Sequence, residues 1–345
     1  MTSSATAVAH ANIALAKYWG KRDEALALPA TSSLSLTLDA FRTTTTVTLG
    51  DLAPGGPDVA TLDGAPMAGD ALARVQRFLD LVRGLAGSDL PASVVSVATV
   101  PTGAGLASSA SGFAALAGAA ATAYGLDLAP RALSRLARRG SGSAARSVFG
   151  GLVLWHAGTD DATSYAEPVP FPAVLDPAMA VVVLDDGAKP VSSRVAMRRT
   201  VQTSPFFPGW VEATEQDVAE MLAAVAAGDL PVLGELAESN ALRMHATMLG
   251  ARPPVRYWTG RTMAVLDQVQ GLRADGVGCW ATMDAGPNVK VLCAGSDLTT
   301  VAAALATGAD GTGPQRVVTA RPGPDLRVST GAAADAAVDP AEVLA

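Results

Sequence analysis

Two lysines stand four residues apart in the stretch NIALAKYWGKRD, residues 12–23. The chain has 25 Lys and Arg residues, of which only Lys17, Lys21, Lys189 and Lys290 are lysine. Most surface lysines can be replaced by arginine, so the lysines kept in such a chain mark places that need a compact ammonium rather than a planar guanidinium. Lys17 and Lys21 are therefore predicted to belong to a functional site. The alternative is a chance pair on a solvated strand edge.

A second candidate is the stretch PTGAGLASSAS, residues 101–111, which is rich in glycine and serine. Gly103 and Gly105 would let the backbone turn sharply and approach a ligand closely. Ser108 and Ser109 stand at the start of a predicted helix, where free N–H groups and hydroxyls suit a phosphate. The stretch fits neither GxxxxGK[ST] nor GxGxxG, so it indicates a phosphate site of another type. An ordinary glycine-rich loop capped by serine is the alternative.

Two shorter stretches, SGSAARS and MDAGPN, also hold residues that could do chemistry. One turn of helix would bring the Ser143 hydroxyl and the Arg146 guanidinium to the same side, and a guanidinium suits a carboxylate or a phosphate. Asp284 ends an apolar strand before a Gly-Pro turn, where a carboxylate could accept a proton or orient a hydroxyl. Taken alone, each stretch also has a plainer interpretation: a capping serine beside a solvated arginine, and a usual turn sequence.

The bulk composition restricts the class of protein. At 345 residues the chain is long enough for two lobes, and its net charge of −7 argues against a nucleic-acid partner. We find no run of about 18 apolar residues and no signal-peptide pattern, so no membrane partner is expected. Cys279 and Cys293 lack metal-ligand spacing, so neither a metal cage nor a disulfide framework is expected. Together these features predict a cytoplasmic protein.

The elements that must position these residues are a mixture of strands and helices without a regular βαβ repeat, which predicts an α+β, two-lobed architecture. Alternating or continuous apolar residues predict strands within 32–50, 91–101, 150–155, 179–186, 279–284, 289–295 and 316–323. Helical spacing of apolar residues predicts helices over 70–86, 108–124, 130–139, 211–227, 229–249 and 261–274. Residues after about 330 are expected to form a flexible tail.

NIALAKYWGKRD, PTGAGLASSAS, SGSAARS and DAGPN, in this order and spacing, resemble the diphosphomevalonate decarboxylases of the GHMP kinase superfamily. The resemblance extends from about Asn12 to about Gly323 and includes LPATSSLSLTL, KPVSSRVAM and ESNALRMHATMLGARPPVRYW. It implies a two-lobed GHMP kinase fold, with a ribosomal-S5-domain-2-like N-terminal lobe, a ferredoxin-like C-terminal lobe and an active site in the cleft between them. The expected divisions are a nucleotide-binding lobe at 1–178, a second lobe at 179–330 and a tail at 331–345.

The resemblance also implies an activity: ATP-dependent decarboxylation of mevalonate 5-diphosphate to isopentenyl diphosphate, with release of ADP, phosphate and CO2. A tertiary hydroxyl is a poor leaving group, so phosphorylation of the 3-hydroxyl comes first. Loss of that phosphate creates positive character at C3, which the electrons of the departing carboxylate quench. The implied cofactors are ATP and Mg²⁺. The implied partner is the small-molecule substrate, and the implied assembly is a homodimer with neither nucleic acid nor membrane.

The resemblance assigns roles residue by residue. Asp284 is the base or orienting carboxylate at the 3-hydroxyl, and Lys17 lies between it and the transferring phosphoryl group. Arg146 holds the substrate carboxylate, and Asn12 is a hydrogen-bond partner at the phosphoryl site. The substrate diphosphate is expected to contact Tyr18, Lys21, Ser141 and Ser143, with Ser192 or Ser193 completing the pocket. The ATP phosphates are expected to contact Pro101, Gly103, Ala104, Gly105, Leu106, Ala107, Ser108 and Ser109, with Ser108 or Ser109 near Mg²⁺.

Three alternative functions stay open at this point. A mevalonate 5-phosphate decarboxylase would keep the same charged residues and need fewer groups for the distal phosphate. A mevalonate-type 3-kinase or a non-catalytic anion-binding protein of the same fold would lack part of the charged set. The presence of Lys17, Arg146 and Asp284 favours the full reaction. The diphosphate substrate is favoured by Tyr18, Lys21, Ser141 and Ser143.

Overall fold

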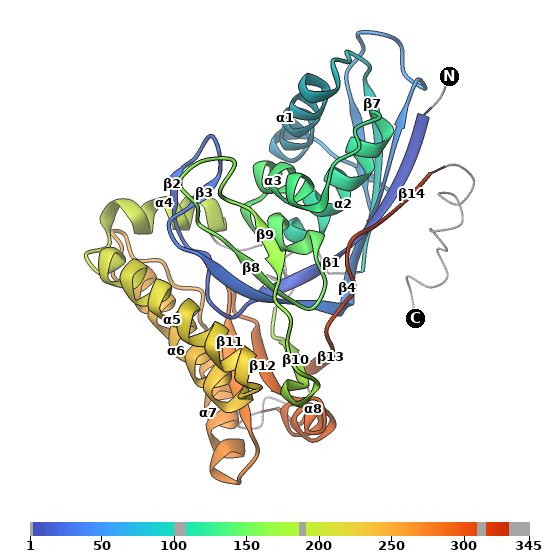
Figure 1. Cartoon of the computed structure of the whole chain (residues 1–345). Helices are drawn as coiled ribbons and strands as arrows, with labels where there is room; N and C mark the ends of the chain where they lie inside the picture. The colour runs from blue at the N-terminus through green and yellow to red at the C-terminus, as the bar shows by residue number, and fades with distance from the viewer. Residues whose placement is uncertain (1–2, 100–107, 186–190, 309–314, 331–345) are drawn as a thin grey trace.

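The chain is described by a computed structural model over residues 3–99, 108–185, 191–308 and 315–330. These residues form two lobes, each built on one main β-sheet with helices packed against it (Figure 1). A short two-stranded ribbon of β2 (Lys21–Asp23) and β3 (Leu28–Pro29) follows the first strand. The predicted α+β, two-lobed architecture is confirmed.

The first lobe contains an eight-stranded sheet in the order β14-β1-β4-β7-β5-β6, with β8 paired to β4 and to β9. Its longest pairing joins β1 and β4 in antiparallel register from Ser3 opposite Leu49 to Ala14 opposite Ser35. The register shifts between His10 and Asn12, and such a bulge re-aims side chains at the end of a strand. The strands are β1 (Ser3–Ala14), β4 (Ser33–Leu49), β5 (Val59–Leu62), β6 (Ala65–Pro66), β7 (Ala92–Ala98), β8 (Leu152–Trp155), β9 (Ala166–Pro168) and β14 (Arg327–Thr330).

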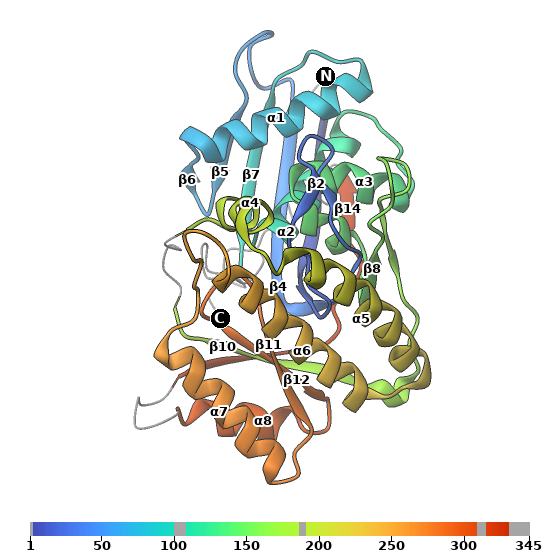
Figure 2. The same cartoon turned by 90° about the vertical axis from the view of Figure 1, so that its left-hand side faces the viewer.

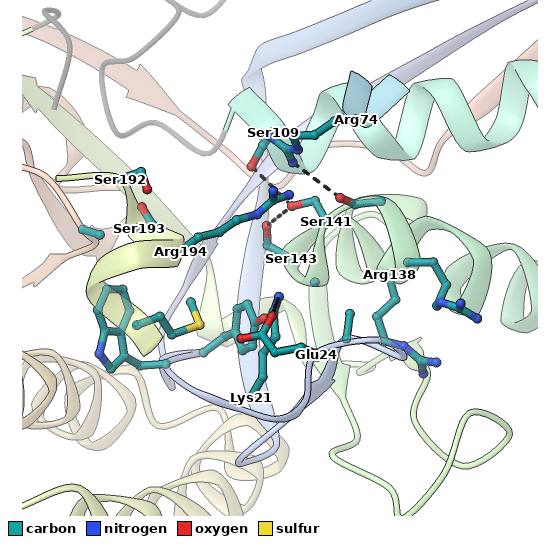
Figure 3. Close-up of a pocket in the computed structure, with 18 of the residues that line it drawn as sticks. Lys21, Glu24, Arg74, Ser109, Arg138, Ser141, Ser143, Ser192, Ser193 and Arg194 are labelled. Carbon is teal, nitrogen blue, oxygen red and sulfur yellow. Dashed lines mark hydrogen bonds and ion pairs between the residues drawn. The ribbon is translucent and has the colours of Figure 1, made fainter. Parts of the chain in front are cut away.

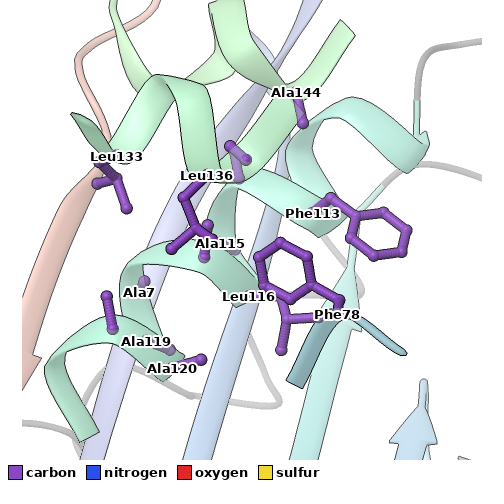
Figure 4. Packing of buried hydrophobic residues seen from close by; sticks show 14 of the residues in the cluster. Ala7, Phe78, Phe113, Ala115, Leu116, Ala119, Ala120, Leu133, Leu136 and Ala144 are labelled. Carbon is purple, nitrogen blue, oxygen red and sulfur yellow. The ribbon is translucent and has the colours of Figure 1, made fainter. Parts of the chain in front are cut away.

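Three helices pack with this sheet: α1 (Gly69–Ala86), α2 (Ser108–Ala123) and α3 (Pro130–Gly140). The small residues of α2 let its backbone lie very near β1; a Cβ built on Gly118 would stand 3.2 Å from that of Ala7. Figure 4 shows this alanine-lined contact, with Phe78 and Phe113 filling the wider space between α1 and α2. The close approach fixes α2, the helix that begins with Ser108 and Ser109, against the first strand.

The second lobe contains a four-stranded sheet in the order β11-β12-β10-β13. Alternate residues of its strand β10 enter two different apolar clusters, Met179 and Val181 on one face and Ala180 and Val182 on the other. A strand covered on both faces has no polar alternation, which explains the continuous apolar run AVVV. The strands are β10 (Pro177–Val183), β11 (Cys279–Met283), β12 (Val289–Ala294) and β13 (Arg316–Ala320).

The two faces of the small sheet have different neighbours (Figure 2). One apolar cluster contains Val265 and Val301 from α7 (Gly260–Ala274) and α8 (Leu298–Ala306). The other contains residues of α5 (Phe207–Ala227), α6 (Leu230–Leu249) and the large sheet, Leu34 and Leu36 of β4 among them. Because the two lobes share this second core, side chains from both are held at fixed positions where the lobes meet.

The helices and strands predicted from the sequence are present, with ends shifted by a few residues. The sequence patterns did not predict α4 (Ser193–Thr203), α8 or the strands β1, β2, β3, β9 and β14. Alanine, which is depleted in strands, makes up five of the twelve residues of β1. The strand at 316–323 is the last one that the sequence predicts, and this is wrong as the end of the fold, because β14 follows it and pairs with β1. The proposed tail lies outside the described residues, and the division at residue 178 stays a prediction. No helix in the described ranges combines the length and the apolar character needed to cross a membrane.

Candidate active site

A cleft of about 1310 Å³, called here the interlobe cleft, is lined by residues of both lobes. Figure 3 shows its polar side chains, with Ser192 and Ser193 on one wall and Ser109, Ser141 and Ser143 on the other. Every predicted site residue that the structure describes lines it: Asn12, Lys17, Tyr18, Lys21, Ser108, Ser109, Ser141, Ser143, Arg146, Ser192, Ser193 and Asp284. The remaining predicted residues lie outside the described ranges: Pro101, Gly103, Ala104, Gly105, Leu106 and Ala107.

Lys17 follows the end of β1 and is 1 % exposed. Its backbone N–H donates to Asn240 Oδ1 of α6 at 2.8 Å, which ties the segment after β1 to the second lobe. Its Nζ donates to the Ala14 carbonyl at 2.7 Å and to Asp284 Oδ1 at 2.9 Å. Burial lowers the pKa of Lys17 to about 8, against the opposing attraction of Asp284. The ammonium is thus present at neutral pH and is easily titrated.

Asp284 stands immediately after β11, at the turn that leads into β12. Lys17 contacts its Oδ1, and the Nζ of Lys290 lies 3.1 Å from its Oδ2. Burial acts to raise the pKa of this carboxyl, but the two ammonium groups outweigh burial and hold the pKa well below its usual range. Asp284 is therefore a carboxylate at any pH near neutrality, and it can accept a hydrogen bond from a substrate hydroxyl.

Arg146 lies in a 3₁₀ helix over Gly142–Val148 and is 2 % exposed. Its Nε donates to Asn12 Oδ1 at 3.1 Å, and another guanidinium nitrogen donates to the Ser33 hydroxyl. Asn12 Nδ2 in turn donates to the Ser143 carbonyl at 3.0 Å and to the Ser147 hydroxyl at 2.8 Å. Burial lowers the pKa of Arg146 to about 10, so the fork stays charged near neutrality. Asn12 therefore links the Arg146 guanidinium to the Ser143 carbonyl, a connection that the predicted helical turn alone does not provide.

Tyr18 packs on the SGS segment at a position that requires glycine. A Cβ on Gly142 would lie 2.6 Å from the Tyr18 hydroxyl, so only glycine leaves room for the ring. That hydroxyl is buried and has no hydrogen-bond partner among the described residues, while burial raises its pKa above the ordinary value. A protonated phenol that lacks an acceptor and lines the cleft is suited to donate to a ligand anion.

A chain of serine hydroxyls runs along one wall of the cleft. Ser109 Oγ lies 3.3 Å from Ser141 Oγ, which lies 3.5 Å from Ser143 Oγ (Figure 3). The described residues hold no group of three His, Cys, Asp or Glu side chains that could bind a metal ion. This donor set fits a Mg²⁺ ion that is held mainly by substrate phosphates, with a serine hydroxyl such as that of Ser108 or Ser109 as a protein ligand.

The cleft is cationic although the whole chain has a net charge of −7. Four carboxylates line it, together with nine Lys and Arg side chains: Lys17, Lys21, Arg74, Arg77, Arg138, Arg139, Arg146, Arg194 and Arg198. Burial and the neighbouring Arg194 and Arg77 lower the pKa of Arg74 to about 10. Guanidinium groups that repel one another in this way form a site for a polyanion.

The sequence patterns did not indicate several residues in or beside this site, among them Lys290, Asn240, Arg74 and Arg194. Lys290 carried a usable signal, because it is one of only four lysines and follows Asp284 by six positions. Figure 3 shows Arg194 extending from α4 toward Ser141 and Ser143, and α4 itself was not predicted. Arg74 looks like an ordinary residue of an amphipathic helix, and no local pattern distinguishes it. Asn240 lies in ESNALRMHATMLGARPPVRYW, a segment of the family resemblance, but nothing in that segment indicates its bond to Lys17.

Comparisons with known proteins place both halves of the chain in the same group. A family model described as the diphosphomevalonate decarboxylase-like N-terminal domain matches residues 9–166, and one described as the mevalonate 5-diphosphate decarboxylase C-terminal domain matches residues 179–338. The chain is 38% identical over 322 residues to the diphosphomevalonate decarboxylase of Aspergillus fumigatus, a match that covers 87% of this chain and 79% of the relative.

Solved structures agree with this assignment. The fold is similar to the mevalonate diphosphate decarboxylase of Enterococcus faecalis, with 45% identity, a TM-score of 0.89 and coverage of 96% of this chain and 100% of the other. A complex of the protein called MDDEF with MVAPP, AMPPCP and magnesium gives a TM-score of 0.90 at 46% identity, covering 96% and 100% of the two chains.

Proposed function

The chain belongs to the diphosphomevalonate decarboxylase family, and we propose that its interlobe cleft converts mevalonate 5-diphosphate and ATP to isopentenyl diphosphate, ADP, phosphate and CO2. One observation carries the proposal: the Lys17–Asp284 pair and the Arg146 guanidinium, brought from three distant parts of the sequence, line a single cationic cleft. A substrate with a carboxylate, a tertiary hydroxyl and a diphosphate requires this combination of groups. The similar protein MDDEF binds MVAPP together with AMPPCP and magnesium.

The first step forms a bond between the 3-hydroxyl oxygen and the γ-phosphorus of ATP, while the bond from that phosphorus to the ADP oxygen breaks. Asp284 accepts the hydrogen bond of the hydroxyl, orients its lone pair for attack and takes up its proton as the O–P bond forms. The Lys17 ammonium, 2.9 Å from Asp284 Oδ1, stabilises the negative charge that develops on the transferring group. Ser108 or Ser109 would be a protein ligand of Mg²⁺ on the ATP phosphates, and the ion would supply further charge neutralisation.

In the second step the C3–O bond breaks and phosphate leaves, while the C1–C2 electron pair becomes the C2–C3 double bond and C1 departs as CO2. Arg146 binds the C1 carboxylate, and its position is fixed because Asn12 and Ser33 hold its guanidinium from behind. Holding the carboxylate in one orientation keeps the breaking C–C bond aligned with the empty orbital at C3.

The diphosphate anchors the substrate at the other end of the cleft. Tyr18, whose hydroxyl has no partner among the described residues, donates to it, and Lys21 supplies positive charge. Arg74 and Arg194 contribute the extra cations that a second phosphate requires, which favours the diphosphate over the monophosphate. Binding energy from this remote anion positions the reacting carbons without taking part in the chemistry.

Three expectations accompany this function as proposals. The enzyme acts as a homodimer, works in the cytoplasm and needs neither nucleic acid nor a membrane. Light scattering after size-exclusion chromatography gives the mass in solution and so tests whether the enzyme is a homodimer. We also propose that the functional boundary between the lobes lies near residue 178, since the two family models divide the chain at 166 and 179.

The test is a coupled assay that measures ADP, CO2 and isopentenyl diphosphate in parallel, with mevalonate 5-diphosphate and mevalonate 5-phosphate as substrates. Equal amounts of all three products from the diphosphate support the proposal. ADP without CO2 would identify a 3-kinase, and a preference for the monophosphate would identify the other decarboxylase. No product from either substrate would indicate a binding protein and overturn the proposed function.

A further inference from the structure

Lys290 is a charged residue in the middle of an otherwise apolar strand. It stands in β12, which is an inner strand of the four-stranded sheet, and it is 0 % exposed. Val289 and Val291 enter the apolar cluster under α7 and α8, so alternation directs Lys290 to the opposite face, with Leu292. That face meets the first lobe. A lysine is almost never fully buried unless it is paired, so its partner must explain its position.

One partner is Oδ2 of Asp284, the carboxylate oxygen that Lys17 does not contact. The Nζ of Lys290 lies 3.1 Å from Oδ2 and 3.5 Å from the Asn288 carbonyl. The contact of Lys290 with Oδ2 is an ion pair that does not meet hydrogen-bond geometry. Oδ2 is closed to solvent, whereas the Asp284 side chain as a whole is 25% exposed, so the part that faces the cleft excludes Oδ2. Lys290 does not line the interlobe cleft, although Asp284 does. The ammonium therefore stands behind the carboxylate and does not touch a substrate in the cleft.

We propose that Lys290 is a positioning residue: its ammonium holds Oδ2 of Asp284, so that Oδ1 stays directed at Lys17 and at the substrate hydroxyl. This inference rests on the proposed function, in which Asp284 accepts the hydrogen bond of the 3-hydroxyl. A carboxylate bound at one oxygen alone can turn about its Cβ–Cγ bond. Two ammonium groups, one on each oxygen, fix the plane of the carboxylate and keep it ionised.

The charge of Lys290 also acts on Lys17. The titratable groups around the pair are Arg146 from the 3₁₀ helix and His245 from α6, in addition to the three residues themselves. Lys290 helps to lower the pKa of Asp284 by attraction and that of Lys17 by repulsion. Removal of its charge therefore raises both pKa values, a signature that loss of packing alone does not produce.

The experiment compares the wild type with Lys290→Met, a neutral side chain of similar length. We expect kcat to decrease by about 10- to 100-fold, because a displacement of about 1 Å can cost about 100-fold. KM for mevalonate 5-diphosphate stays within about threefold, since Lys290 contributes no substrate contact. The alkaline limb of the kcat/KM profile moves to higher pH. Thr282→Val is the matched control: it removes a buried, unpartnered hydroxyl from the residue opposite Lys290 on β11, and its kinetics should equal those of the wild type.

Two results would overturn the inference while the proposed function stands. In the first, the wild type is active, and Lys290→Met has the same kcat and the same alkaline limb of the kcat/KM profile as the wild type. In the second, Lys290→Met has a lower kcat but the alkaline limb of its kcat/KM profile does not move, which would indicate a packing role. A wild type that makes no product instead overturns the proposed function, and the inference with it.

The pairing itself has a test that needs no activity. Asp284→Asn leaves the Lys290 ammonium buried without its carboxylate, so the double variant Asp284→Asn/Lys290→Met should have a higher Tm than Asp284→Asn alone. An equal or lower Tm would contradict the pairing.

Discussion

The Lys17 ammonium donates a 2.9 Å hydrogen bond to Asp284 Oδ1 across 267 positions of the chain. Lys17 comes from the end of β1 in the first lobe, and Asp284 comes from the end of β11 in the second. The pair forms only where the two lobes share a core, so neither lobe alone contains the site.

Asp284→Asn should lower kcat by about 10³-fold while the affinity for ATP changes little, because general acid–base groups typically contribute about 10²- to 10⁴-fold and the side chain lies at the hydroxyl. Steady-state kinetics and calorimetric titration with ATP measure the two quantities. Asp80→Asn is the control, since Asp80 is a cleft carboxylate whose side chain is 66% exposed. A kcat near the wild-type value for Asp284→Asn would show that its assigned role is wrong.

The activity should fall as the pH rises through about 8, the value to which burial lowers the pKa of Lys17. The active form carries the proton, so kcat/KM is high below this pH and is lost above it. Bound anionic substrates stabilise the ammonium, which places the limb of kcat at higher pH than that of kcat/KM. A pH-rate profile from 6 to about 10 measures both limbs. A kcat/KM that stays level to pH 10 would exclude a titrating Lys17.

Arg146→Lys should uncouple the two chemical steps. A lysine keeps the charge but loses the fork that binds Asn12, Ser33 and a carboxylate together, so phosphoryl transfer continues while decarboxylation slows. Rapid-quench sampling in the first turnover should find more ADP than CO2. Arg138→Lys is the control, because Arg138 is a buried arginine of the same cleft held by backbone carbonyls and Asp161. Arg138→Lys should lower Tm and keep the amounts of ADP and CO2 equal. Equal amounts of ADP and CO2 in Arg146→Lys would contradict the role assigned to Arg146.

Gly142→Ala should raise KM for mevalonate 5-diphosphate by about tenfold and leave KM for ATP nearly unchanged. The added Cβ would stand 2.6 Å from the Tyr18 hydroxyl, so the ring must move away from the diphosphate site. Overpacking of this kind costs about 1–3 kcal/mol of stability. Gly84→Ala in α1 has open space around it and should stabilise the protein by about 0.5–1 kcal/mol. Equal KM values for Gly142→Ala and the wild type would count against a substrate role for Tyr18.

The sequence predicted the long, strongly periodic helices because burial of one helix face leaves a regular pattern. It predicted β10 and β12 from their apolar runs. It did not predict β1, because alanine in that strand is selected by the closeness of α2 rather than by strand propensity. Packing against a partner element decides such residues, and that partner is far away in the sequence.

The candidate site could be assembled from local motifs because most of the predicted residues lie in short stretches that are rich in glycine, serine or turn residues. The roles of Lys290 and Asn240 become visible only in space, where one lies behind Asp284 and the other accepts the backbone N–H of Lys17. A residue that supports another residue leaves no motif of its own, since its position is fixed by the fold.

The pairing of β14 with β1 has a consequence for synthesis on the ribosome. From the moment β1 emerges until residues 327–330 follow, the outer side of β1 stays without its neighbour over Ala5–Val8. Unpaired strand edges promote association between chains. Emergence of residues 327–330, rather than completion of the other strands of the sheet, is therefore when this edge becomes covered. A nascent chain stalled before residue 327 should depend on chaperones more than the full-length product does.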